Sequence, residues 1–148
     1  MLFRSDRAKP VLEALIQAGN GRFRGIRHGV VWDSGDAAKF GRRHMPRHQM
    51  LDPVFRKGFA CLHPLGVSFE AWLYHPQLSD IAELLKQFPD ANVILNHVGG
   101  PLGVPPHENR KETFEVWRRN VLALVPLDRK STRLNSSHIQ KSRMPSSA

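Results

Sequence analysis

The stretch N-V-I-L-N-H-V-G-G-P-L-G-V-P, residues 92–105, decides how the fold of this chain is interpreted. A short apolar run bounded by turn residues is typical of a buried strand, and this run ends in Asn96 and His97. Two glycines and a proline then require a loop. Because ligands bind at the carboxyl ends of strands in parallel α/β folds, this polar pair is a candidate site. The alternative is a histidine that only caps the loop.

A second strand ends in the same way, at Tyr74-His75-Pro76, which favours a functional edge. Around the two strands, helical and strand-like patterns alternate, and such alternation predicts right-handed crossovers and a parallel sheet. Phe114 and Trp117 are expected in the core, as the apolar face of the last helix. The expected elements are helix 9–18, strand 22–31, a long loop 32–51, helix 53–66, strand 67–74, a helix from Pro76 to Phe88, strand 92–96 and helix 112–125.

The composition is typical of one globular domain. The 148 residues are 41% hydrophobic, enough for a modest core. The formal charge of +9 is uneven, because residues 128–148 hold five Lys or Arg and one Asp, a net +4, which leaves +5 for the rest. Apart from a small cluster at Arg42, Arg43 and Arg47, the other basic residues are scattered. This pattern indicates a solvated surface, with no nucleic-acid partner.

Cysteine usage and hydropathy bear on the compartment. Cys61 is the single cysteine, so neither a disulfide framework nor a cysteine-based metal motif is expected. No apolar run has membrane-spanning length, and residues 1–7 lack the apolar centre of a secretory signal. We therefore expect a cytoplasmic protein with no membrane partner.

Three segments carry a family resemblance: F-R-G-I-R-H at 23–28, A-W-L-Y-H-P-Q-L at 71–78 and N-H-V-G-G-P-L-G at 96–103. Through them, residues 10–125 resemble the amidohydrolase-related family of metal-dependent hydrolases, and more closely its branch of TIM-barrel lactonases. The resemblance implies a (β/α)₈ barrel with its site at the strand carboxyl ends. The expected fold class is α/β, a partial TIM barrel with about three parallel strands from the middle of the barrel, near strands four to six.

The resemblance also implies which side chains surround the reaction centre. His97 matches the family's sixth-strand histidine and His75 its fifth-strand histidine, both as catalytic groups and as metal ligands. Arg27 falls where related lactonases place a basic residue against a substrate carboxylate or carbonyl, a task that suits the bidentate guanidinium. The remaining candidates for substrate binding are His28, Trp72, Tyr74, Gln77 and Asn96.

The implied cofactor is a divalent metal, zinc or manganese. Neutral imidazole binds such cations well, and the metal polarises a carbonyl or supplies hydroxide from bound water near neutral pH. Some lactonases of this branch work without metal, so the resemblance leaves open whether one is needed. It also leaves open which parity of the strand at 67–74 faces the substrate, because Trp72 and Tyr74 alternate with Leu73.

Two departures from the family pattern concern the catalytic set. The chain lacks the family's His-x-His pair, since His44 and His48 are four residues apart in a basic loop. It also lacks a late strand with a catalytic aspartate. The following aspartates fit turn, cap or surface roles instead: Asp33, Asp36, Asp52, Asp80 and Asp90. We expect an inactive fragment of an enzyme that hydrolyses a small-molecule lactone or similar cyclic ester, with the oligomeric state open.

Two other functions stay open. The first is a decarboxylase, because the same family frame supports carbon–carbon cleavage. The second is a non-catalytic basic protein that uses its arginine cluster and its last residues on nucleic acid, with an affinity that falls steeply with salt.

The end of the chain, D-R-K-S-T-R-L-N-S-S-H-I-Q-K-S-R-M-P-S-S-A at 128–148, has no apolar periodicity. A disordered basic tail is one interpretation. The other is that the segment is not native, because it is similar to the conceptual translation of a sequencing-library adapter on both sides of a variable gap at 139–141. We expect a barrel domain at 1–127 and a non-native or disordered tail at 128–148.

Overall fold

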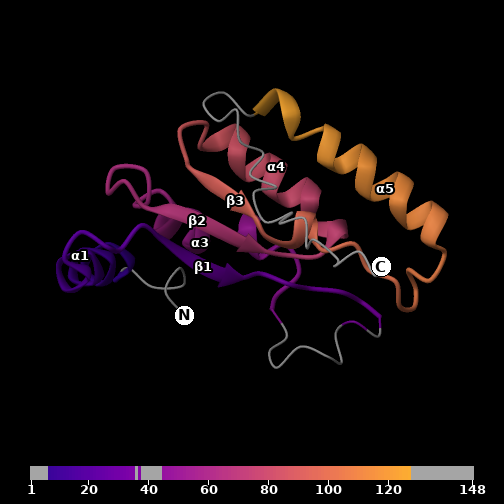
Figure 1. Ribbon diagram of the computed structural model, residues 1–148, viewed down its shortest axis with the longest axis horizontal. Helices are drawn as coiled ribbons and strands as arrows, with labels where there is room; N and C mark the ends of the chain where they lie inside the picture. The colour runs from indigo at the N-terminus through magenta and orange to yellow at the C-terminus, as the bar shows by residue number, and fades with distance from the viewer. Residues whose placement is uncertain (1–6, 36, 38–44, 128–148) are drawn as a thin grey trace, which may run out of the picture.

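The computed structural model describes residues 7–35, 37 and 45–127, so the tail at 128–148 and His44 lie outside the described residues. Helices and strands alternate along the described chain (Figure 1). The helices are α1 (Ala8–Gly19), α3 (Pro53–Phe59), α4 (Leu78–Gln87) and α5 (Arg110–Leu122). The strands are β1 (Gly25–Gly29), β2 (Ser68–Trp72) and β3 (Val93–Leu95). Short 3-10 turns are η2 (Gln49–Leu51), η3 (His75–Gln77), η4 (Asn96–Gly99) and η5 (Val125–Leu127).

The strands form one parallel sheet in the order β1-β2-β3. Arg27 of β1 is in register with Glu70 of β2, and Phe69 of β2 is in register with Val93 of β3. In Figure 1, α4 and α5 lie together on the β3 side of the sheet, while α1 lies near the start of β1. The predicted parallel α/β arrangement is confirmed.

Local sequence explains where α3 begins. The Asp52 carboxylate accepts hydrogen bonds from the backbone N–H groups of Val54 at 2.7 Å and Phe55 at 3.2 Å, and Pro53 occupies the first turn. The helix was expected to reach Gly66 but ends at Phe59, and residues 60–66 form turns. Pro64 cannot continue a helix because it lacks the backbone donor.

The core lies on one face of the sheet. Phe69, Ala71 and Leu73 are fully buried, and the Phe69 ring meets the Phe59 ring of α3 edge to face at 5.2 Å between centroids. Successive residues of a strand point to opposite faces, so Trp72 and Tyr74 face away from this core. This assigns Phe69, Ala71 and Leu73 to the core face, while contact of the opposite face with a substrate stays a prediction.

Helix α5 contacts the rest of the molecule along a narrow stripe. Trp117 is half-buried and packs against the core, as expected. Phe114 is 52% exposed, so the expectation that it belongs to the core is wrong; its ring lies beside Trp117 at 5.5 Å instead. Thr113, the residue before Phe114, is buried instead. None of the helices in the described part of the chain combines the length and the apolar character needed to cross a membrane.

Candidate functional site

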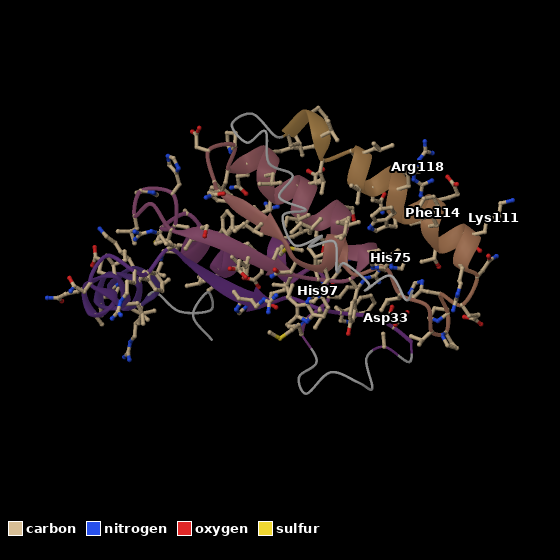
Figure 2. All side chains as sticks on the ribbon, in the orientation of Figure 1. Asp33, His75, His97, Lys111, Phe114 and Arg118 are labelled. Atoms are coloured by element: carbon tan, nitrogen blue, oxygen red, sulfur yellow. The ribbon has the colours of Figure 1, made fainter. Side chains whose placement is uncertain are left out.

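Polar side chains gather where the parallel strands end. Strand β1 is followed by Asp33, β2 by His75 and β3 by His97. Figure 2 shows these three side chains beyond the arrowheads of the strands. The later loop before α5 adds His107, which contacts both Asp33 and His75. The edge therefore carries several imidazoles beside one carboxylate.

His75 is buried, with 2% of its surface exposed, and it begins the η3 turn. Its backbone N–H donates to the carbonyl of Gly100 at 3.1 Å, and its ring Nδ1 accepts from the backbone N–H of Leu102 at 3.4 Å. Burial, and then the neighbouring His107, lower the pKa of His75 to about 4, although Asp33 acts in the opposite direction. The ring is thus neutral near pH 7, and because Nδ1 accepts a hydrogen bond, its proton resides on Nε2.

Asp33 and His107 form a pair that sequence reasoning missed. His107 Nε2 lies 2.9 Å from Asp33 Oδ1, and the other carboxylate oxygen accepts from the backbone N–H of Gly35 at 2.9 Å. Both side chains are largely buried, with 21% of His107 and 3% of Asp33 exposed. We expected Asp33 to serve a turn. The Gly35 contact is such a turn, but nothing in the local sequence pairs this aspartate with a histidine 74 residues away.

His97 lies in an unusual stretch of backbone. His97 and Val98 have φ values of 49° and 53°, and Gly99 and Gly100 continue in the left-handed region. A β-branched residue rarely adopts this conformation, which costs about 1–3 kcal/mol. Two contacts hold it: the His97 ring packs against the Trp72 ring at 4.5 Å, and the Trp117 indole N–H donates to the Val98 carbonyl at 2.6 Å.

The predicted residues of β1 lie on opposite faces. Arg27 is exposed, and its Nε lies 3.6 Å from a carboxylate oxygen of Glu70, on the face that also carries Trp72. His28 lies on the core face, where its ring packs 5.9 Å from Phe55 and burial lowers its pKa. The structure therefore brings Arg27, but not His28, onto the face that carries Trp72.

The other predicted substrate-binding residues differ in their contacts. The Gln77 amide joins the ends of two strands, since it donates to the Val30 carbonyl and accepts from the backbone N–H of Trp32 at 2.9 Å. The Tyr74 ring lies 6.0 Å from the Trp72 ring. Asn96 has a buried amide nitrogen without a hydrogen-bond partner in the described ranges. For all of these residues, substrate contact stays a prediction.

The described residues do not by themselves complete a metal site. A divalent catalytic metal needs at least three protein donors, and residues 7–35, 37 and 45–127 contain no group of three His, Cys, Asp or Glu side chains placed to hold one. His75 and His97, the two ligands that the family resemblance implies for these units, are fewer than three, and their role as metal ligands stays a prediction. We therefore derive no step through a metal from these side chains.

Comparison with known proteins places this geometry in context. A family model described as amidohydrolase matches residues 2–124. The uncharacterized protein y4mH of Sinorhizobium fredii is 32% identical over 123 residues, which are 83% of this chain and 38% of that protein.

Solved structures agree on the fold. Two crystal structures of an amidohydrolase from Burkholderia multivorans, one with bound HEPES and one with bound zinc, superpose with a TM-score of 0.59 over 84% of this chain, at 21% and 20% identity. The match covers 39% and 38% of those chains, so this chain spans about two fifths of the length of the proteins it matches. Its three-stranded parallel unit matches part of their fold.

Proposed function

The chain belongs to the amidohydrolase family, and we propose that it supplies the middle β/α units of a TIM-barrel hydrolase that opens a lactone or similar cyclic ester. The observation that carries this proposal is the group of side chains at the carboxyl edge of the sheet, with His75, His97 and the Asp33–His107 pair on adjacent loops. Ring opening of a lactone needs a donor to the carbonyl oxygen and an acceptor for the proton of attacking water.

Two features support hydrolysis of a carbonyl substrate at this edge. His75 is neutral near pH 7 and keeps its proton on Nε2, so it can donate a hydrogen bond to a carbonyl oxygen without being an acid. Arg27 lies on the face that carries Trp72, where its guanidinium could meet a substrate carboxylate in place of Glu70. The acidic groups of dicarboxylate or sugar-acid lactones would suit this cation.

The chain by itself is proposed to be inactive on lactones. It spans about two fifths of its relatives, and within its described residues neither the His-x-His pair nor a metal-holding group is present. One crystal structure of a similar amidohydrolase contains bound zinc. If a metal takes part in the parent enzyme, the other donors would come from units that this sequence does not contain.

A graft tests the proposal. In this graft, residues 10–125 of the present chain replace the matching segment of full-length y4mH. Native y4mH, the graft and the isolated chain are then assayed on sugar lactones and dicarboxylate lactones, with a pH indicator that reports the acid released. We expect the graft to hydrolyse a lactone and the isolated chain to hydrolyse none. His97→Asn should abolish lactone hydrolysis by the graft, and His63→Asn should leave it unchanged. His63 is the control because it is exposed and lies in the turns before β2, whereas the edge loops follow the strands.

Two results would contradict the proposal. Turnover by the isolated chain at the rate of the graft would exclude an inactive fragment. A folded graft that releases carbon dioxide from carboxylated substrates, while leaving every lactone intact, would replace the hydrolase by the decarboxylase alternative.

The division of the chain is also a proposal. The family match ends at residue 124, which supports a barrel domain at 1–127 and a non-native segment at 128–148. Long-read sequencing of the source locus, done without that adapter, should show codons for a different amino-acid sequence in place of residues 128–148. A locus that encodes Asp128–Ala148 followed by a stop would contradict this division.

A further inference from the structure

The loop after β3 forms a short left-handed turn. His97 and Val98 have φ values of 49° and 53°, and Gly99 and Gly100 follow at 80° and 48°. Glycine adopts a positive φ at little cost, whereas a residue with a Cβ is strained there, and Val98 is β-branched as well. The first half of the turn is therefore strained and the second half is not. The strained half carries His97.

The glycine half of the turn rests on the end of β2. A Cβ at Gly100 would collide with the Leu73 carbonyl. The Gly100 carbonyl accepts a hydrogen bond from the backbone N–H of His75 at 3.1 Å, and its N–H donates to the His97 carbonyl at 3.0 Å. These contacts hold the glycine end of the turn and do not involve the Val98 carbonyl.

Helix α5 supplies the contact to the strained half. The Trp117 indole N–H donates to the Val98 carbonyl at 2.6 Å. Four residues earlier, on the same face of the helix, the Thr113 hydroxyl donates to the His107 carbonyl at 3.0 Å. One helix therefore presents two side-chain donors to two different edge loops, and Trp117 is the donor to the loop that carries His97.

Packing of the Val98 side chain does not explain its conformation, because 42% of this residue is exposed. Strain of this kind persists only where the surrounding structure imposes it, and it is common at functional sites. The conformation of the turn sets the direction in which the His97 side chain leaves the backbone, and the His97 ring packs 4.5 Å from the Trp72 ring. A group that holds the turn thus also orients the imidazole.

We propose that Trp117 is a positioning residue for His97. Its indole N–H holds the Val98 carbonyl and keeps the turn left-handed, and the turn directs the imidazole along the Trp72 ring at the carboxyl edge of the sheet. Trp117 acts on the reaction through His97 and not on the substrate itself. The inference rests on the proposed function for its effect on turnover, and it adds α5 to the support of the site.

NMR of the whole chain tests the turn directly. The NOE between the amide and α protons of one residue is stronger at positive φ than in a right-handed helix or a strand. We expect strong intraresidue NOEs at His97 and Val98 in the unaltered chain. Trp117→Phe keeps an aromatic ring but removes the indole donor, so Val98 should relax toward negative φ and its NOE should weaken.

Two variants on the same helix are matched controls. Thr113→Val removes the other donor of α5 without a change of size, and Phe114→Leu removes the ring that lies beside Trp117. Figure 2 shows Phe114 on α5, apart from His97. Both variants should leave the NOE at Val98 strong. A Trp117→Phe chain with an equally strong NOE at Val98 would overturn the proposal.

The unaltered chain keeps the proposal testable if Trp117→Phe does not fold. The Trp117 indole proton should exchange with solvent more slowly than that of free tryptophan, because it is engaged with the Val98 carbonyl. Exchange at the rate of free tryptophan would overturn the proposal.

Lactone hydrolysis by the y4mH graft tests the consequence for turnover. Trp117→Phe should lower kcat roughly tenfold, short of the hundredfold that a displacement of about 1 Å can cost, and should change KM little. The assay is run far below the urea midpoint of the variant, so that loss of folded protein does not lower the rate. Phe114→Leu should keep the kcat of the graft.

A second substitution separates positioning from a general structural role. Glycine at residue 98 tolerates positive φ without support, so the turn should stay left-handed even without the indole donor. The double variant Trp117→Phe with Val98→Gly should therefore be faster than Trp117→Phe alone. A double variant no faster than the single one would show that Trp117 does not act through the turn, and would overturn the proposal.

Failure of this inference is distinguishable from failure of the proposed function. A graft that hydrolyses lactones equally fast with and without Trp117→Phe would reject the positioning role and keep the hydrolase. An NOE at Val98 that weakens in Trp117→Phe, in a graft that leaves every lactone intact even with Trp117, would keep the positioning of His97 and reject the lactone substrate.

Discussion

Acid should destabilise this chain through His75. Burial, and then His107, lower the pKa of the folded His75 from 6.5 to about 4. Below pH 6.5 the unfolded chain binds a proton at this position while the folded chain does not, so the free energy of unfolding falls as the pH falls. Each pKa unit corresponds to about 1.4 kcal/mol, and between pH 7 and pH 5 the predicted loss is at most about 2 kcal/mol.

Urea unfolding of the unaltered chain and of His75→Gln, at pH 7 and at pH 5, isolates this contribution. Carboxylates also titrate in acid, but they do so in both chains, so the difference between the two pH dependences belongs to His75. His63→Gln is the matched control, because His63 is exposed and should keep the full pH dependence of the unaltered chain. Equal slopes for the His75 variant and the unaltered chain would refute the reasoning, as would an NMR titration in which His75 takes up its proton near pH 6.5.

Three further predictions concern stability, measured by urea unfolding at pH 7. Asp52→Ala removes the cap of α3 and should cost about 1 kcal/mol, whereas Asp52→Asn keeps an acceptor and should cost less; equal losses would contradict the capping role. Phe59→Ala should cost about 3–5 kcal/mol because the ring is 1% exposed, and Phe114→Ala, at 52% exposed, less than about 0.5 kcal/mol. Val98→Gly should stabilise the chain by about 1 kcal/mol, since glycine relieves the positive φ; a loss of stability would show that the Val98 side chain matters more than its backbone.

The fold was predictable because its signals are local and repeat along the chain. Each strand has a short apolar run, and each helix has apolar residues at helical spacing, so the β/α alternation is visible in the sequence. The alternation then predicts parallel strands, and the sheet order β1-β2-β3 follows. The ends of elements were less predictable, because the end of α3 at Phe59 depends on turns and on packing within the core.

The site was predictable only in part, because a strand pattern does not say which face is covered. Arg27 and His28 are neighbours in a motif that resembles one family segment, yet they point to opposite faces of β1. That difference depends on α3, whose Phe55 covers the His28 side. A sequence pattern can therefore place a polar pair at a strand end without saying which member reaches the substrate.

The Asp33–His107 pair marks the limit more sharply. Each residue by itself has an ordinary explanation, a turn for Asp33 and a polar loop for His107, and both explanations hold locally in the structure. What neither explains is why a largely buried carboxylate needs an imidazole from a loop 74 residues away. Burial of an unpaired carboxylate is expensive, so the two loops are stable together only when the pair forms. The contact that holds the two loops together also fixes the proton of His107 on Nε2, because a carboxylate oxygen can only accept a hydrogen bond.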